Sequence, residues 1–399
     1  MTSDGATARP LVSVIIPTHN RPECAVSTIR AVLAASPLIE VVVSDTSEVD
    51  AISPALAATP SPRLKLLRPG RPLSVVENFN LGLEAASGDF LVFIGDDDLV
   101  SPEIVAVAEW ARSEGVDAVG FSFPLLYYWP DFVSTTHWKA SGATLAINAY
   151  DGRVRELDTR GELATALRNL GAGVLDMPRA YAGMVSRELI ERIVTRHGAL
   201  FGGVSPDIYS AALISLEARR ACRLDFPVVV PGASGGSTSG HSARGRHVGG
   251  LRDNAHIGAF KNLVWDERVP EYYSVPTVWG FSLLKAIEDK PEWLKQADFA
   301  RLYIKCVITD PHFKGLVWGC LRAHSRRVGL LPAAGGLFVA LCREASRVAR
   351  VLRRRLSSPA LQVQAEVVSG IANTEQALLA LTHHRATSPV RLALPTRKH

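Results

Sequence analysis

Short apolar runs rich in β-branched residues alternate with segments of helical spacing over the first hundred residues of the chain. Strands are predicted at LVSVIIP (11–17), IEVVVSD (39–45), RLKLLRP (63–69) and FLVFIG (90–95), and helices at 22–35 and 75–88. The charge alternation of RLKLLRP is typical of an edge strand, and Gly88 is expected to cap the second helix. Strands that alternate with helices favour an α/β fold with a mostly parallel sheet covered by helices.

Polar residues follow three of these predicted strands. Thr18 to Arg21 come after the first strand, Asp45 ends the second, and Asp96 to Asp98 come after the fourth. Ligands of open parallel sheets bind beyond the carboxyl ends of the strands. We therefore expect the three polar segments to meet at one crevice.

The three consecutive carboxylates of Asp96, Asp97 and Asp98 repel one another unless a cation lies beside them. Mg²⁺ and Mn²⁺ prefer oxygen ligands, and the phosphates of a bound diphosphate can fill their remaining positions. The motif therefore predicts a divalent cation that neutralises charge on a departing diphosphate. The alternative is a solvated acidic turn before a helix with Ser101 as N-cap and Pro102 at its first position.

Length and composition favour a folded globular protein. The chain has 399 residues, 47% hydrophobic and 21% charged, enough for one large domain with an appendage or for two domains. Its five cysteines are far apart in sequence and form no C-x-x-C pair, which predicts neither a zinc site nor a disulfide framework. This usage suits a reducing cytoplasm. We expect no signal peptide, because the N-terminus MTSDGATARP has no apolar core, and no membrane span, because the apolar run 329–342 is short and interrupted by glycine and proline.

Charge is distributed unevenly along the chain. Residues 301–399 contain 16 Lys and Arg against 4 Asp and Glu, which leaves 28 against 35 for residues 1–300. Within the basic part, residues 338–356 predict an amphipathic helix with Phe338, Leu341 and Ala345 on its apolar face. Two interpretations remain open for this helix: contact with anionic lipid, or packing on the protein. Binding of nucleic acid is not expected, because the aromatic and basic platform of such proteins is missing.

Three segments resemble motifs of the family 2 glycosyltransferases with the GT-A fold. SVIIPTHNRP resembles their first strand and nucleotide loop, EVVVSDTSEVD their second strand with its base-binding acid, and FLVFIGDDDLVSPEIV their metal-binding strand and following helix. This resemblance covers residues 11 to about 125. LSVVENFNLGLEAASGDFLVFIGDDD and GGVSPDIYSAAL extend it to abequosyltransferase-like enzymes of bacterial polysaccharide synthesis.

The resemblance implies a division of the chain and a set of site residues. It implies a GT-A catalytic domain at 1–250, with the nucleotide and metal in 11–125 and the acceptor in 126–250, and a helical C-terminal region at 251–399. The implied donor contacts are Pro17, Thr18, Asn20, Arg21, Asp45, Asn80 and Asp96. Asp97 and Asp98 would hold Mg²⁺ or Mn²⁺, and Asp207 would be the catalytic base. Which carboxylate touches the ion stays open, because the chain has G-D-D-D where many relatives have D-x-D-D.

Two of the expected site residues also fit ordinary structural roles. Asp207 follows Ser205 and Pro206, an ordinary helix start in which an acid favours the helix dipole, and Asp176 and Glu217 are alternative bases. His241 lies in the Gly- and Ser-rich stretch 231–250, which predicts a mobile loop, and it is a further candidate metal ligand.

The implied reaction is an inverting transfer of a sugar, of hexosyltransferase type, from a nucleotide-diphosphate donor to a hydroxyl. The acceptor would be a glycan or a lipid-linked glycan of the bacterial cell envelope, reached in the cytoplasm or at the inner face of the membrane. The alternative is a nucleotide-binding or scaffold protein of the same fold without catalysis.

Overall fold

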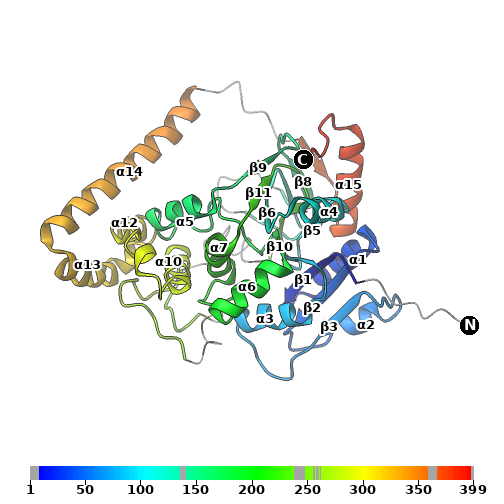
Figure 1. Ribbon diagram of the computed structural model, residues 1–399, viewed down its shortest axis with the longest axis horizontal. Helices are drawn as coiled ribbons and strands as arrows, with labels where there is room; N and C mark the ends of the chain where they lie inside the picture. Colours follow the sequence, from blue (N-terminus) through cyan, green and yellow to red (C-terminus); the bar gives the residue numbers. More distant parts are fainter. Residues whose placement is uncertain are drawn as a thin grey trace, which may run out of the picture.

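The computed structural model describes residues 9–134, 141–237, 248–254, 257, 260, 262–357 and 366–396 (Figure 1). His241 lies outside these ranges. The central element is an eight-stranded sheet of order β3-β2-β1-β4-β10-β6-β11-β9. Its strands are β1 (Val12–Thr18), β2 (Ile39–Asp45), β3 (Leu64–Leu67), β4 (Phe90–Phe93), β6 (Ala118–Phe121), β9 (Val154–Glu156), β10 (Gly183–Ser186) and β11 (Ala221–Leu224).

Strands β1 to β4 run parallel to one another, as do β6 and β11, whereas β10 and β9 run antiparallel to their neighbours. The predicted mostly parallel sheet is therefore confirmed, and β3 lies at its edge as expected. Helices cover both faces of this sheet, and for this reason its parallel strands are nearly continuous apolar runs in the sequence.

Helices cover the two faces of the sheet and form two cores. Val14 and Ile16 of β1 pack on one side with α1 (Pro22–Ala35), α2 (Ile52–Leu56) and α4 (Ile104–Glu114). Ile15 packs on the other side, because successive side chains of a strand point to opposite faces. The helices on that second side are α3 (Val75–Ala85), α5 (Thr159–Arg168), α6 (Arg187–His197) and α7 (Pro206–Glu217).

Two predicted helix ends are wrong. Helix α4 begins at Ile104 rather than after a Ser101 cap, and the buried Ser101 hydroxyl has no hydrogen-bond partner among the described residues. Helix α3 ends at Ala85, and Gly88 does not cap it. Instead the Gly88 N–H lies 2.7 Å from Oγ of Ser13 and 3.2 Å from Oε1 of Glu40, which hold the chain extended before β4.

A second sheet packs beside the first, with order β13-β7-β8-β14. It joins β7 (Leu125–Tyr128) and β8 (Thr144–Ile147) to β13 (Gly232–Ala233) and to β14 (Glu366–Ser369). Nearby, β5 (Leu99–Val100) pairs with β12 (Val229–Val230).

The last described segment of the chain returns to the N-terminal part. Helix α15 (Thr374–Thr387) packs on α1, and Figure 1 shows both at the same end of the molecule. The backbone N–H of Thr374 donates to Ser27 Oγ at 3.1 Å, and Trp110 Nε1 donates to the Pro395 carbonyl at 2.7 Å.

Helices between residues 275 and 357 form an extension at the opposite end of Figure 1. They are α10 (Val275–Ala286), α11 (Pro291–Leu294), α12 (Phe299–Thr309), a 3₁₀ turn (Pro311–Phe313), α13 (Lys314–Val328) and α14 (Leu330–Ser357). Helix α10 packs on α7, and α12, α13 and α14 pack on one another. Within the described ranges, none of the helices combines the length and apolar character needed to span a bilayer.

Candidate active site

The carboxyl ends of three strands meet, as the sequence predicts. Thr18 at the end of β1 lies opposite Asp45 at the end of β2 in the parallel register. The Thr18 hydroxyl donates to Oδ2 of Asp96, beyond the end of β4, at 2.5 Å. All three side chains are buried. We call the group made by Thr18, Arg21, Asp45, Asp96, Asp97 and Asp98 the strand-end cluster.

Arg21 supplies the cation beside the triple aspartate. Its guanidinium forms an ion pair with Asp96, and Nη1 lies 3.2 Å from Oδ2 of Asp97. Burial lowers the pKa of Arg21, but the carboxylates of Asp96 and Asp97 raise it by more than burial lowers it. The guanidinium therefore stays charged next to these two carboxylates.

One guanidinium does not neutralise three carboxylates. Burial raises the pKa of Asp96 to about 7, against the effect of Arg21. Burial and the charge of Asp97 raise the pKa of Asp98 to about 6, although the backbone N–H groups of Gly232 and Gly95 oppose this. The cluster therefore holds its negative charge unfavourably, which is the electrostatic condition for binding a further cation.

Residues 231–237 fold over the triple aspartate and do not behave as the predicted mobile loop. The Gly232 N–H donates to Oδ1 of Asp98 at 2.7 Å, and the Ser234 hydroxyl donates to Oδ2 of Asp97 at 2.7 Å. A Cβ atom on Gly232 would lie 1.8 Å from the carbonyl oxygen of Asp97, so only glycine fits at this position. The prediction for this stretch is wrong at 231–237 because buried carboxylates need hydrogen-bond donors, and this segment supplies them.

The carboxylate oxygens of the cluster fit a divalent cation through Asp97. In the part of the chain that the structure describes, no donor reaches Asp97 Oδ1, whereas Oδ2 accepts from Arg21 and Ser234. No three His, Cys, Asp or Glu side chains among the described residues are grouped so that they alone could hold an ion. Mg²⁺ is commonly held by one or two carboxylates together with substrate phosphates, and the residues present fit that mode.

The loops after β1 and β2 are tied to each other. Asp45 forms an ion pair with Arg68 and accepts from the Ser47 N–H at 2.8 Å. Asn20 has a positive φ of 54°, its N–H donates to Ser47 Oγ at 2.7 Å, and its Oδ1 accepts from the Glu48 N–H at 3.1 Å. These contacts fix the position of Asp45 in the strand-end cluster and of Asn20 in the loop after β1.

The other two predicted donor residues are both half-buried. Pro17 is in β1, half-buried, and lies opposite Ser44 in the register with β2. Asn80, on α3, donates through Nδ2 to the Phe201 carbonyl at 3.1 Å. In the described part of the chain its side chain forms no hydrogen bond with the strand-end cluster.

Asp207 lies in the first turn of α7 and is half-buried. Ser205 is the N-cap residue by position, but its hydroxyl donates to Oδ1 of Asp207 at 2.5 Å instead of capping the helix. The alternative bases are engaged elsewhere: Glu217 pairs with Arg196 and His197, and Asp176 pairs with Arg223.

The guanidinium of Arg179 interacts electrostatically with Asp207 and with Asp98 of the strand-end cluster. Its guanidinium lies 4.7 Å from the centroid of the Phe123 ring. Burial lowers its pKa, while Asp207, Tyr181 and Asp98 act in the opposite direction. Among the described residues no carboxylate is within salt-bridge distance of Arg179, so this half-buried cation is available to an anionic ligand.

Three supporting side chains of the site could not be assigned from sequence. Trp129 Nε1 donates to the Asp97 carbonyl at 2.9 Å, and the Tyr181 hydroxyl donates to Oδ2 of Asp98 at 3.3 Å. Aromatic rings such as these and Tyr128 can stack on a sugar or pack in a core, and here Trp129 and Tyr128 are buried and Tyr181 is half-buried. Arg179 has no flanking motif that would have identified it.

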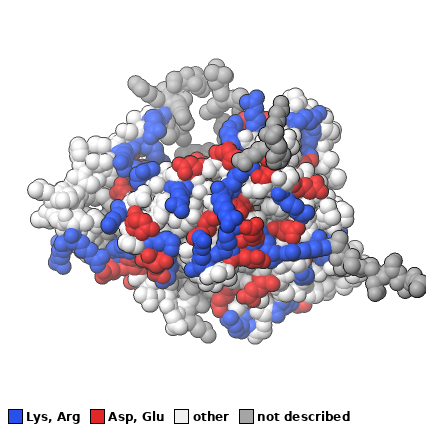
Figure 2. Space-filling model, in the orientation of Figure 1, with Lys and Arg blue, Asp and Glu red and all other residues white. Residues whose placement is uncertain are grey.

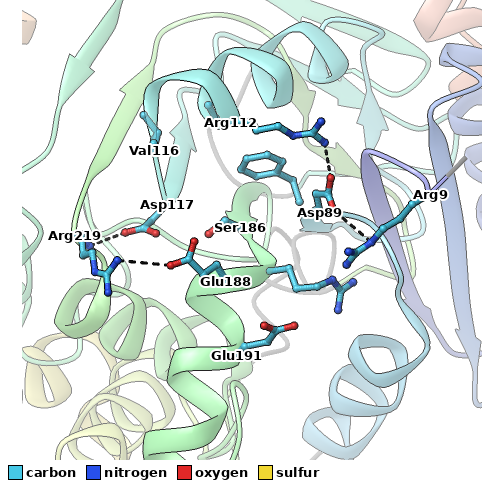
Figure 3. Close-up of a pocket in the computed structure, with 13 residues that line it drawn as sticks. Arg9, Asp89, Arg112, Val116, Asp117, Ser186, Glu188, Glu191 and Arg219 are labelled. Atoms are coloured by element: carbon cyan, nitrogen blue, oxygen red, sulfur yellow. Dashed lines mark hydrogen bonds and ion pairs between the residues drawn. The ribbon is translucent and has the colours of Figure 1, made fainter. Parts of the chain in front are cut away.

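A cavity of about 490 Å³ opens at the other end of the central sheet, beside Phe90 at the start of β4 (Figure 3). Its lining has four arginines and four acids, and some of them are paired with each other: Arg9 lies 3.3 Å from Asp89, and Arg219 lies 3.6 Å from Glu188. Because its acids and bases are balanced in this way, we assign no ligand to it.

The N-terminal part of the sequence matches a known family. Residues 13–153 match the sequence profile of Glycosyl transferase family 2. No curated protein matches the chain by sequence. The predicted similarity to abequosyltransferase-like enzymes stays a prediction.

Solved structures resemble the chain at low identity. TarS 1–349 of S. aureus in complex with UDP-GlcNAc is 15% identical with a TM-score of 0.45, and the match covers 80% of this chain and 92% of that one. The mannosyltransferase PcManGT of Pyrobaculum calidifontis, in complex with GDP-Man and Mn²⁺, is 17% identical with a TM-score of 0.40, over 96% and 88% of the two chains.

The profile match contains all but the first residue of β1, all of β2 to β4, and every member of the strand-end cluster. It agrees with the observed mostly parallel sheet and its helical layers. The chain therefore contains, at residues 13–153, a region that matches Glycosyl transferase family 2, within an α/β fold of the GT-A type.

Proposed function

We propose that the protein transfers a sugar from a nucleotide-diphosphate donor to an acceptor hydroxyl with inversion at the anomeric carbon. The observation that carries this proposal is the hydrogen bond from Thr18 to Asp96, with Asp45 beside Thr18. It joins three strand ends into one acidic site within a glycosyltransferase domain.

The donor would lie across these strand ends. Thr18 and Asp45 would contact the base, with Pro17, Asn20 and Arg21 around it, and Asp96 would contact the ribose. Asp97, through its free Oδ1, and Asp98 would hold a divalent cation against the diphosphate. Such an ion, when bound, neutralises negative charge on the departing diphosphate.

Asp207 would act as the base. The acceptor oxygen attacks the anomeric carbon as the bond from that carbon to the diphosphate oxygen breaks, and the acceptor proton passes to the Asp207 carboxylate. The hydrogen bond from Ser205 occupies Oδ1 of Asp207, and Oδ2 is left for the acceptor. Arg179, charged and without a carboxylate partner among the described residues, would stabilise the leaving diphosphate.

The acceptor would be a glycan or lipid-linked glycan of the bacterial cell envelope. This step rests on the similarity of 73–98 and 202–213 to polysaccharide enzymes. The second candidate function is donor binding without catalysis. It is favoured by the burial of all three aspartates under residues 231–237.

The experiment combines thermal shift with donor hydrolysis for the full chain. UDP, dTDP, GDP and CDP sugars would each be tested with and without Mn²⁺, for the unchanged protein and for Asp97→Asn. Asp289→Asn is the matched control, because Asp289 is an exposed acid that pairs with its neighbour Lys290. We expect one donor class to stabilise and to be hydrolysed only with the ion.

The outcomes of this screen separate the two candidate functions. Loss of both effects in Asp97→Asn, with Asp289→Asn unchanged, would support the transferase. Stabilisation without turnover for any donor, with acceptor glycans supplied, would favour the binding protein. Absence of every effect would overturn both.

A further inference from the structure

Helix α14 packs on the protein with a face other than its apolar one. Among the residues of α14 whose side chains the structure describes, the buried ones are Ala333, Ala340 and Glu344, which recur at helical spacing. A Cβ added to Gly336 would lie 3.4 Å from the Cβ of Ala300 on α12. Glu344 forms an ion pair with Arg301 of α12 at 2.8 Å. A stripe of small residues and one buried ion pair therefore hold α14 in place.

The predicted apolar face of α14 points away from the rest of the protein. Leu331, Phe338 and Leu341 have 86%, 68% and 52% of their surface exposed, and Leu330 is also exposed. Leu331, Phe338 and Leu341 are three, seven or ten residues apart, so they share a face that is turned from Ala333, Ala340 and Glu344, and Leu330 lies at the edge of that face. We call Leu330, Leu331, Phe338 and Leu341 the outer face of α14. Packing on the protein, one of the two interpretations from sequence, does not cover it in the described structure.

Helices α13 and α14 also carry positive charge that has no carboxylate partner among the described residues. Residues 314–357 contain ten Lys and Arg and one acid, Glu344, which is buried. Lys314, Arg322, Arg326 and Arg350 are exposed, and none has a carboxylate within salt-bridge distance in the described ranges. Arg322 lies over the exposed ring of Trp318, 5.6 Å from its centroid. Figure 2 shows uncharged atoms at this end of the molecule with basic side chains beside them.

We propose that α13 and the outer face of α14 dock on the surface of a bilayer that contains anionic phospholipid. Apolar side chains would enter the boundary between head groups and acyl chains, and the free Lys and Arg side chains would contact lipid phosphates. A second copy of this chain fits less well, because pairing two such surfaces would bring many like charges together. Nucleic acid would leave Leu331 and Phe338 exposed.

Docking would hold the transferase next to a lipid-linked acceptor. The purpose of docking therefore rests on the proposed function. Docking itself does not depend on transfer. It can therefore be measured without nucleotide, and donor hydrolysis can be measured without vesicles. If the chain hydrolysed donor but did not bind vesicles, only the docking proposal would be wrong. If it bound vesicles but did not hydrolyse donor, only the proposed function would be wrong.

The test is flotation of the full chain with vesicles of phosphatidylcholine alone, or with added phosphatidylglycerol. We expect binding only to the anionic vesicles, and weaker binding at high salt. The double variant Phe338→Ser and Leu341→Ser should lower the affinity about tenfold or more, because two large apolar groups no longer enter the bilayer. The matched control is the double variant Val49→Ser and Val264→Ser, since these valines are 73% and 84% exposed elsewhere.

Charge is tested separately with Arg326→Glu, for which the control is Arg160→Glu on the exposed side of α5. We expect several-fold weaker binding for the first and no change for the second. Thermal melting checks that each variant folds, and light scattering reports its oligomeric state. Equal binding to both vesicle types, unchanged binding by Phe338→Ser with Leu341→Ser, or a dimer that this variant dissociates would each overturn the proposal.

Discussion

Arg21 Nη1 lies 3.2 Å from Oδ2 of Asp97, so a guanidinium already occupies one side of the carboxylate that we assign to the divalent ion. The other oxygen of Asp97 faces no donor in the described part of the chain. Asp97 can therefore keep its contact with Arg21 while Oδ1 binds an ion, and the two cations would compete only weakly for it.

Replacement of Asp97 by asparagine should remove ion binding and leave the fold intact. The amide loses the ion pair with Arg21, but it also removes a like charge between Asp96 and Asp98, so the two effects on stability oppose each other. We expect the Kd for Mg²⁺ in the presence of donor to rise at least about tenfold, which is about 1.4 kcal/mol. Calorimetric titration measures this, and an unchanged Kd would show that another group binds the ion.

The stabilisation by Mg²⁺ should increase with pH. The folded-state pKa is about 7 for Asp96 and about 6 for Asp98, both above the ordinary value of 3.8. Between pH 3.8 and about pH 7 the folded protein therefore holds protons that the unfolded chain has released. The metal-free protein loses stability as pH rises through this range. Mg²⁺ must displace those protons, so its stabilising effect should be small near pH 5 and large near pH 8. Melting curves with and without Mg²⁺ across this range measure the effect, and a shift independent of pH would contradict it.

The sequence predicts β1 to β4 correctly because a short, continuous apolar run such as VSVIIPT is typical of a strand in a sheet with both faces covered. Thr18, Asp45 and Asp96 are likewise predicted to meet, since parallel strands end on one side of the sheet. Both predictions depend on local pattern and one rule of topology.

The sequence does not predict contacts that depend on distant packing. Gly232 meets Asp98 across 134 positions, and the glycine- and serine-rich composition of that stretch gives no sign that it covers carboxylates. The amphipathic pattern of 338–356 predicts a helix but not the face that packs. The buried Ala333 and Ala340 lie on the face that packs here, where Gly336 also comes close to Ala300 of α12.

Gly232→Ala should disrupt the site more than the fold. The added Cβ would lie 1.8 Å from the Asp97 carbonyl oxygen, so residues 231–237 must move and the hydrogen bond to Asp98 is lost. We expect the free energy of unfolding to fall by about 1–3 kcal/mol and donor binding to weaken. Gly319→Ala in α13 is the control, because a Cβ there meets nothing within 4 Å, and it should be neutral or stabilising. Equal behaviour of the two variants in urea unfolding would contradict this role of Gly232.

Replacement of Asp207 and replacement of Arg179 should have different effects on kcat and on nucleotide binding. Asp207→Asn keeps the size of the side chain and its contact with Ser205 but removes the base, so kcat should fall by about 10²–10⁴ while the Kd of the donor is unchanged. Arg179→Met should lower kcat by a smaller factor and weaken binding of the nucleoside diphosphate product, because it removes the cation assigned to the diphosphate. Single-turnover rates and product titrations of both variants and of the double variant measure these effects. Glu217→Gln is the control, since Glu217 lies at the far end of α7 in an ion pair with Arg196. If Asp207→Asn turned over at the rate of the unchanged protein, the base would have to be a different residue.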